Sequence, residues 1–213
     1  MISLLFIPNL LYLLLPLYSH YLYRPVKLVN TVNNVVLYSY FFSLIHSVFI
    51  SFNSILFLNN RYDCLTYTYI TLNSIVYLII DIFILNYEKG FKKIRKIFTF
   101  HHMGFITLIY MNYTNFFQDD YLDTYIISLG LLGEICVIPL NINWVLIKTN
   151  SKKTLLFNYS NKILVIFYFL FRIIGYSYAV YLSIYYKFYV AILISLPLLI
   201  MNYVWFYKLL YLN

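Results

Sequence analysis

Six side chains that can carry a charge lie inside long apolar stretches of this sequence. They are three histidines, two carboxylates and one guanidinium: His46, Asp81, His101, His102, Glu134 and Arg172. Imidazole exchanges protons near neutral pH, a carboxylate orients an imidazole or pairs with a cation, and a guanidinium binds a carboxylate or a phosphate. Each such group costs at least about 2.5–3.5 kcal/mol inside a bilayer, so we expect these side chains to face a partner or a wet cavity.

The two adjacent histidines are the strongest candidates for chemistry. Neighbouring residues on a helix point about 100° apart, so one ring can face a cavity while the other orients or packs. Glu134 or Asp81 would orient the reacting imidazole, and Arg172 would hold a phosphate or a carboxylate. The plainer alternative makes His46 a packed core histidine and Arg172 part of a structural ion pair with Asp81 or Glu134. We predict that the catalytic candidates are His101, His102 and Glu134. The candidates for lining the cavity or binding lipid are His46, Asp81, Asn141 and Arg172.

The composition indicates which elements must position these residues. Of 213 residues, 63% are hydrophobic and only 10% are charged, whereas soluble domains have about 45–50% and about 25%. The sequence therefore predicts an integral membrane protein. Two cysteines are too few for a disulfide framework or a zinc cluster, and five glycines leave no glycine-rich phosphate loop. We expect no metal and no other cofactor.

Apolar runs of about 20 residues, enough for one helix to cross a bilayer, occur seven times. They cover about 2–22, 35–58, 67–87, 97–117, 122–147, 163–186 and 189–211. Because these runs are continuous and do not alternate, they favour helices over membrane strands. We predict an all-α membrane protein with an additional N-terminal helix and loop at 1–34 and a six-helix domain at 35–213.

Basic residues are unevenly shared between the two sides that seven spans create. The loops 23–34, 88–96 and 148–162 and the C-terminus together hold twelve of them, whereas the opposite side holds only Arg61 and Lys187. Such an excess marks the cytosolic side, so we predict a cytosolic C-terminus and a lumenal N-terminus. The net charge of +8 is then mainly a topology signal, and nucleic acid is not an expected partner. We expect a solvated turn at the lumenal aspartates Asp119, Asp120 and Asp123.

Helical periodicity aligns the ionisable residues with other polar side chains on six successive helices. For example, one face of the sixth predicted helix carries Tyr168, Arg172, Tyr176 and Ser183. Six such stripes are most economically placed facing inward in a ring, with lipid outside. Serine and asparagine on these stripes also suit plain hydrogen bonding between helices.

Four short motifs, taken in order, resemble one family of membrane proteins. They are FHHMGFITLIY at 100–110, GEICVIPLNINWVLIK at 133–148, FYFLFRIIGY at 167–176 and MNYVWFYKLL at 201–210. Their order is similar to that in the TLC-domain family, which includes ceramide synthases, translocon-associated membrane proteins and several small members. The resemblance covers about residues 35–211 and is strongest for the small members, around Glu134, Pro139, Leu140, Asn141 and Trp144. Asn143 stands where their pattern has an arginine.

The resemblance implies a six-helix barrel formed by the second to seventh predicted helices. In ceramide synthases a histidine pair, with acidic residues on the next helix, transfers an acyl group from acyl-coenzyme A to a sphingoid amine. His101 and His102 match that pair, and SLGLLGE at 128–134 provides only Glu134 where the catalytic branch has more acidic residues. The partners that follow are membrane lipid and acyl-coenzyme A. The expected location is an internal membrane such as the endoplasmic reticulum.

Three classes of function fit these observations. Binding or organising membrane lipid in an intramembrane cavity ranks first, because the acidic set is incomplete. The alternative is a membrane acyl or lipid transferase that uses the pair His101–His102. A small-solute transporter ranks last, because paired Gly- or Pro-broken helices at matching positions are missing from the sequence.

Overall fold

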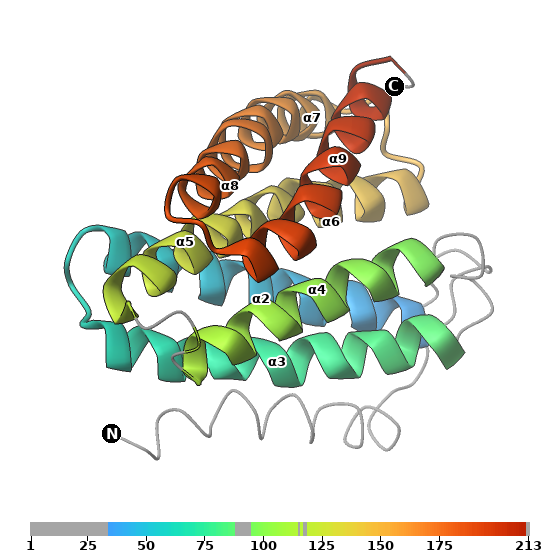
Figure 1. Cartoon of the computed structure of the whole chain (residues 1–213). Coiled ribbons are helices and arrows are strands. Elements are labelled where there is room, and N and C mark those ends of the chain that lie inside the picture. The colour runs from blue at the N-terminus through green and yellow to red at the C-terminus, as the bar shows by residue number, and fades with distance from the viewer. Residues whose placement is uncertain (1–33, 88–94, 115, 117–118, 212–213) are drawn as a thin grey trace.

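The computed structural model describes residues 34–87, 95–114, 116 and 119–211, and these residues form helices and no strand (Figure 1). The first predicted helix, at 2–22, lies outside the described residues. The described elements, in chain order, are α2 (Asn34–Leu58), α3 (Cys64–Tyr87), α4 (Arg95–Tyr113), α5 (Asp120–Leu132), η2 (Gly133–Cys136), α6 (Val137–Lys148), α7 (Leu155–Phe167), η3 (Tyr168–Gly175), α8 (Tyr176–Tyr185) and α9 (Tyr189–Tyr211).

These elements make six long rods in the described part of the chain. The elements α5, η2 and α6 run on as one rod over 120–148, and α7, η3 and α8 form another over 155–185. Five rods are long and apolar enough to cross a membrane, and α4 is less apolar because it carries Arg95, Lys96 and the two histidines. The predicted all-α membrane class is confirmed. The count of seven spans stays a prediction.

Three of the helices begin after a residue whose side chain accepts a hydrogen bond from the backbone amide three residues later. Asp63, Asp119 and Thr154 do so before α3, α5 and α7, at 2.6, 2.9 and 3.3 Å. These bonds satisfy amides that have no partner inside the helix. The amide of Thr66 also holds the pKa of the Asp63 carboxyl below its ordinary value.

Two sequence expectations about loops are wrong for the same reason. The loop expected at 148–162 ends earlier, because α7 begins at Leu155 and its polar residues occupy a helix face. Ser160, inside that expected loop, is buried and donates to the Pro139 carbonyl at 3.3 Å. Asp123, expected in a solvated turn, lies in the first turn of α5 and is only 3% exposed. Packing against other helices, which the chain's polarity alone does not indicate, decides both cases.

Three helix ends in the described residues adopt the same tight turn. Asn60, Asn150 and Lys187 have left-handed φ angles of 56°, 57° and 61°. The amide that follows each residue bonds to a carbonyl five residues earlier, as Arg61 does to Leu56 at 2.9 Å. This arrangement ends a helix within one turn. It connects α2 to α3, α6 to α7 and α8 to α9 by short links.

The rods pack into one bundle whose contacts run from neighbour to neighbour. The helix α3 packs between α2 and α4, and α4 packs on α9, which in turn packs on η3 and α8. The rod 155–185 packs on the rod 120–148, and the latter packs back on α2. Figure 1 shows α3 and α4 side by side below α8 and α9. The family-type barrel stays a prediction, because α5 also contacts α3 and α4.

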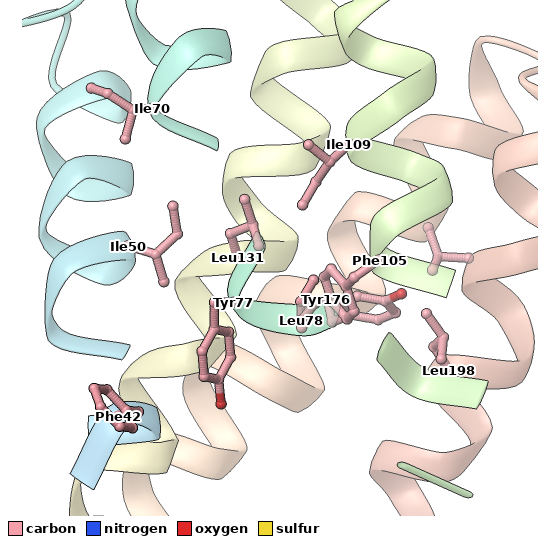
Figure 2. Close-up of a cluster of buried hydrophobic side chains, with 11 residues drawn as sticks. Phe42, Ile50, Ile70, Tyr77, Leu78, Phe105, Ile109, Leu131, Tyr176 and Leu198 are labelled. Carbon is pink, nitrogen blue, oxygen red and sulfur yellow. The ribbon is translucent and has the colours of Figure 1, made fainter. Parts of the chain in front are cut away.

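The bundle has an apolar surface and a partly polar interior, as suits a protein in lipid. Large apolar side chains such as Phe83 and Leu193 are 70% and 74% exposed. The apolar core in Figure 2 draws on most rods and includes Ile50, Phe105 and Leu198. Buried serines separate such residues, and several bond to their own helix: Ser47, Ser54, Ser183 and Ser195 donate to the carbonyls of Ser43, Ile50, Ala179 and Ala191.

One glycine lets α4 approach α9 closely. A Cβ atom at Gly104 would lie 3.1 Å from Leu198 Cδ1 and 3.3 Å from Ile194 Cγ2. Few real Cβ atoms make contacts that short, so a side chain at this position would require Leu198 and Ile194 to shift by a few tenths of an ångström. The contact matters for the site because the histidine pair precedes Gly104 by less than one turn.

Candidate functional site

A cavity of about 400 Å³ lies at the end of the bundle where α2 and α4 begin and α3 and α9 end. All seven residues singled out from the sequence line it: His46, Asp81, His101, His102, Glu134, Asn141 and Arg172. Most of the remaining wall is apolar, with Leu78, Leu131, Val137 and Leu164 among its residues. The structure thus brings the predicted residues together. Their catalytic or lipid-binding roles stay predictions.

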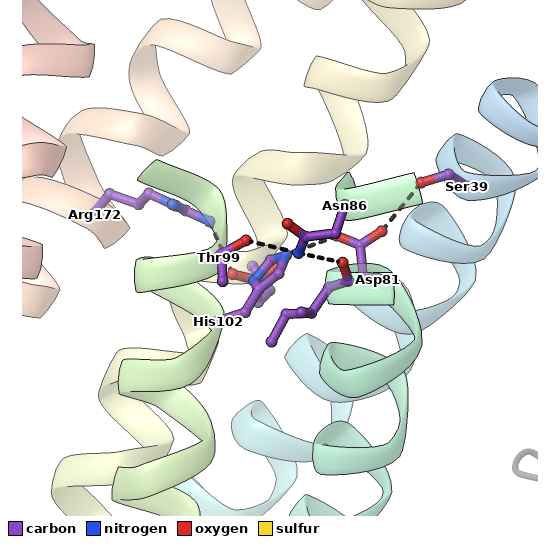
Figure 3. A network of polar contacts seen from close by, with 8 residues as sticks. Ser39, Asp81, Asn86, Thr99, His102 and Arg172 are labelled. Carbon is purple, nitrogen blue, oxygen red and sulfur yellow. Dashed lines mark hydrogen bonds and ion pairs between the residues drawn. The ribbon is translucent and has the colours of Figure 1, made fainter. Parts of the chain in front are cut away.

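A carboxylate and one histidine make the shortest polar contact in the cavity. Asp81 Oδ2 lies 2.6 Å from His102 Nε2, and Asp81 Oδ1 accepts a hydrogen bond from Ser39 Oγ at 3.1 Å (Figure 3). Asp81 therefore ties α3 to both α4 and α2. It fixes the orientation of the His102 ring, whose Nδ1 is buried and has no hydrogen-bond partner within the described structure. A carboxylate in this position can orient an imidazole and stabilise a positive charge on it.

The second histidine of the pair is held by aromatic rings. The His101 ring lies edge-on to Phe105 and Trp205, with centroid distances of 5.0 and 5.8 Å. It is 5% exposed, and its Nδ1 is buried without a hydrogen-bond partner among the described residues. The two rings lie 5.7 Å apart. One imidazole is thus oriented by a carboxylate and its neighbour by apolar packing, the division of roles that adjacent histidines make possible.

The guanidinium pairs with a carboxylate on the adjacent rod. Arg172 Nη2 donates to Glu134 Oε1 at 2.8 Å, and Arg172 Nε donates to the Gly133 carbonyl at 3.1 Å. Of the two partners left open by the sequence, Glu134 is the one observed. Because Arg172 is already committed to Glu134, its expected role of holding a phosphate or carboxylate stays a prediction.

The two residues of this ion pair lie in irregular helix segments. Glu134 lies in the 3-10 segment η2, and Arg172 lies in the π-helical segment η3. Pro139 lacks the amide that would bond to the carbonyl of Ile135, which favours tightening of the helix just before it. At Gly133 a Cβ atom would lie 3.4 Å from Arg172 Cγ, which is ordinary van der Waals contact.

The remaining predicted residues have mainly structural contacts. The His46 ring stacks on Tyr77 with centroids 3.9 Å apart and is 2% exposed. Asn141 Nδ2 donates to the carbonyl of Tyr40 on α2 at 3.2 Å. His46 therefore fits the plainer alternative of a packed histidine in the cavity wall. Asn141 lines the cavity while fastening α6 to α2.

A family profile described as the TLC domain matches residues 30–211, which is most of the chain. This chain belongs to the TLC-domain family. The resemblance predicted from the four motifs is confirmed, and with the apolar helices it establishes a multi-pass membrane protein of the TLC type. Searches of curated proteins and of solved structures found no match.

The segment 134–144, which most resembles the small TLC-domain members, makes contacts with two other helices. Trp144 stacks on Tyr40 with ring centroids 3.9 Å apart, three residues beyond the contact that Asn141 makes on the same partner. Asn143 Nδ2 donates to Asn161 Oδ1 on α7 at 3.4 Å. The segment thus connects α6 to α2 on one side and to α7 on the other. Asn143, which departs from the family pattern, is one of these connectors.

Sequence reasoning missed several residues of the TLC-domain cavity. Tyr40, Trp205 and Lys208 all line it. On α9, Trp205 and Lys208 follow Asn202 at spacings of three, so the polar stripe of the last helix continues through them. That spacing is the signal that could have identified them. Within the described residues no three His, Cys, Asp or Glu side chains come together as a metal site.

Proposed function

We propose that this TLC-domain protein binds or organises a membrane lipid in the cavity described above. The observation that carries the proposal is a mostly apolar cavity of about 400 Å³ into which a few polar groups converge. Ligand sites commonly have this size and this division between apolar walls and orienting polar groups. Membrane lipid is compatible with the lipid association of the family.

The proposed orientation places the cavity in the cytosolic half of an internal membrane such as the endoplasmic reticulum. Basic residues at the cavity end of the described helices support this orientation: Arg95, Lys96, Lys148, Lys152, Lys153, Lys162 and Lys208. Such an excess is typical of the cytosolic side. Protease removal of a C-terminal tag from sealed microsomes would support the orientation, and protection of the tag would contradict it.

If the cavity binds lipid, the purified protein should retain lipid. A variant in which a bulky side chain fills the cavity should not retain it. Leu140 lines the cavity and is half-exposed, so Leu140→Trp adds bulk at the cavity with little disturbance of the core. We expect this variant to lose most of the lipid that mass spectrometry detects in the unaltered protein. Val145→Trp, on the same helix but outside the cavity, is the matched control and should retain it. Equal retention in both variants would contradict the proposal.

A second candidate is transfer of an acyl or other lipid group, and the contact between Asp81 and His102 favours it. Under this proposal an imidazole of the pair takes the proton from an acceptor amine or hydroxyl as that group attacks an acyl thioester such as acyl-coenzyme A. The acyl–sulfur bond breaks, the new amide or ester forms, and the proton passes to the leaving thiolate. Asp81 would orient His102, and Glu134 would act through Arg172.

A further inference from the structure

The ionisable groups inside the cavity are mostly in contact with each other. Asp81 contacts His102 at 2.6 Å, and Glu134 contacts Arg172 at 2.8 Å. Lys208 also lines the cavity, and it has no ion-pair partner in the described residues. A ligand that enters therefore meets one cation that is not already paired.

Lys208 lies where the head of an elongated ligand would be. It follows Trp205 by about one helical turn near the end of α9 and is exposed, whereas Arg172 is buried. Apolar side chains form most of the remaining wall, among them the buried Leu131 and Phe105. The cavity thus combines a mostly apolar wall, in which the polar groups are mostly in contact with each other, with one exposed ammonium group among the described residues.

The surface around this end of the bundle carries the same sign of charge. The other described basic residues there are Arg95, Lys96, Lys148, Lys152, Lys153 and Lys162, and the carboxylates described at this end, Asp81 and Glu134, lie in the cavity. The described carboxylates outside the cavity, Asp63, Asp119, Asp120 and Asp123, all lie at the opposite end. Such a distribution attracts anions to the cavity end and raises their local concentration.

We infer that the ligand of this cavity is an anionic amphiphile, with a carboxylate or phosphate head at Lys208 and a hydrocarbon tail in the apolar interior. This inference rests on the proposed lipid binding and specifies the class of lipid. Membrane topology accounts for lysines around the rim. Lys208 differs from those lysines because it lines the cavity and has no ion-pair partner among the described residues, and it is therefore the residue to test.

Fluorescence of Trp205 gives a direct measurement of binding. The full chain, with Trp144→Phe so that a single tryptophan remains, is placed in phosphatidylcholine nanodiscs. The probes are a brominated fatty acid, a brominated lysophosphatidic acid and the matching neutral glycerol ester, since bromine quenches a tryptophan that it contacts. We expect both anions to quench Trp205 and to bind about tenfold more tightly than the ester.

Variants of three lysines distinguish a specific contact between Lys208 and the head group from general attraction by the basic surface. Lys208→Gln should weaken binding of both anions about fivefold, the factor for roughly 1 kcal/mol per lysine near a membrane surface, and should leave the ester unchanged. Lys162→Gln, at the same end but outside the cavity, and Lys187→Gln, at the opposite end, should change binding less than about twofold. Quenching by only one of the anions identifies its head group as carboxylate or phosphate and supports the inference.

Two results would overturn the anionic assignment while leaving lipid binding intact. One is equal affinity for the ester and the anions, and the other is an effect of Lys162→Gln as large as that of Lys208→Gln. Absence of quenching by all three probes would instead contradict the proposed binding itself, so the two failures are distinguishable.

Discussion

Replacing Arg172 with methionine is expected to lower the free energy of unfolding by about 3–5 kcal/mol, the cost of removing one partner from a buried ion pair. The Glu134 side chain, 17% exposed, would lose the 2.8 Å contact that compensates its charge. The Gly133 carbonyl would lose its 3.1 Å hydrogen bond from Arg172 Nε. Reversible denaturation in mixed micelles, followed by circular dichroism, measures the loss.

A double variant distinguishes an unpaired charge from lost packing. Arg172→Met with Glu134→Gln removes both charges, so we expect most of the stability to return. Arg95→Met is the matched control. Arg95 donates to the Leu85 carbonyl at 3.0 Å and forms no ion pair in the described residues, so its removal should cost about 1 kcal/mol. An Arg172→Met protein as stable as the unaltered chain would show that the pair contributes little.

Replacing His101 and His102 together by alanine is expected to reduce lipid-group transfer by about 10²–10⁴-fold, the usual contribution of a positioned general base. The assay offers acyl-coenzyme A to the purified protein with sphingoid bases, lysolipids or glycerol lipids. Lipid retention should persist in the variant, because the apolar wall of the cavity remains. Asp81→Asn should slow transfer as well, since the carboxylate that contacts His102 would be lost.

Two controls decide how that result is interpreted. Thr107→Ala alters an exposed residue of the same helix, whose hydroxyl bonds the Met103 carbonyl, and should leave transfer unchanged. Full transfer activity in the double histidine variant would place the chemistry elsewhere. No transfer by the unaltered protein with any acceptor would exclude this candidate and leave lipid binding as the function.

The sequence predicts the spans well, because apolar length is a local property. The last predicted helix, 189–211, has the same bounds as α9, and 35–58 differs from α2 by one residue. The start of α7 was predicted eight residues late, at 163. Its first turns carry polar residues that pack against α6, as Ser160 does on Pro139. Contacts between helices are not visible in the polarity of one segment.

The candidate site was predictable as a set of residues and not as a set of contacts. Ionisable groups in apolar spans must converge on partners, and the cavity contains all of those predicted. Which partner Arg172 takes depends on the rotation of two rods at the irregular segments η2 and η3. The periodicity of polar residues in the sequence assumes regular helices, so it does not predict that rotation. Trp205 and Lys208 were missed because aromatic and basic residues near a helix end usually mark the membrane interface.

Both polar side-chain pairs of the cavity connect helices that follow each other in the chain, and this has a consequence for how the protein is made. Asp81 and His102 lie on α3 and α4, and Glu134 and Arg172 lie on the next two rods. Each pair can therefore form within one helical hairpin, before the rest of the bundle assembles. Since polar groups without a partner are costly in hydrocarbon, insertion of these segments two at a time would let each of these two hairpins enter the bilayer with both partners of its contact. The buried serines that bond to their own helices need no partner at that stage, so they would add no unpaired polar group to such an intermediate.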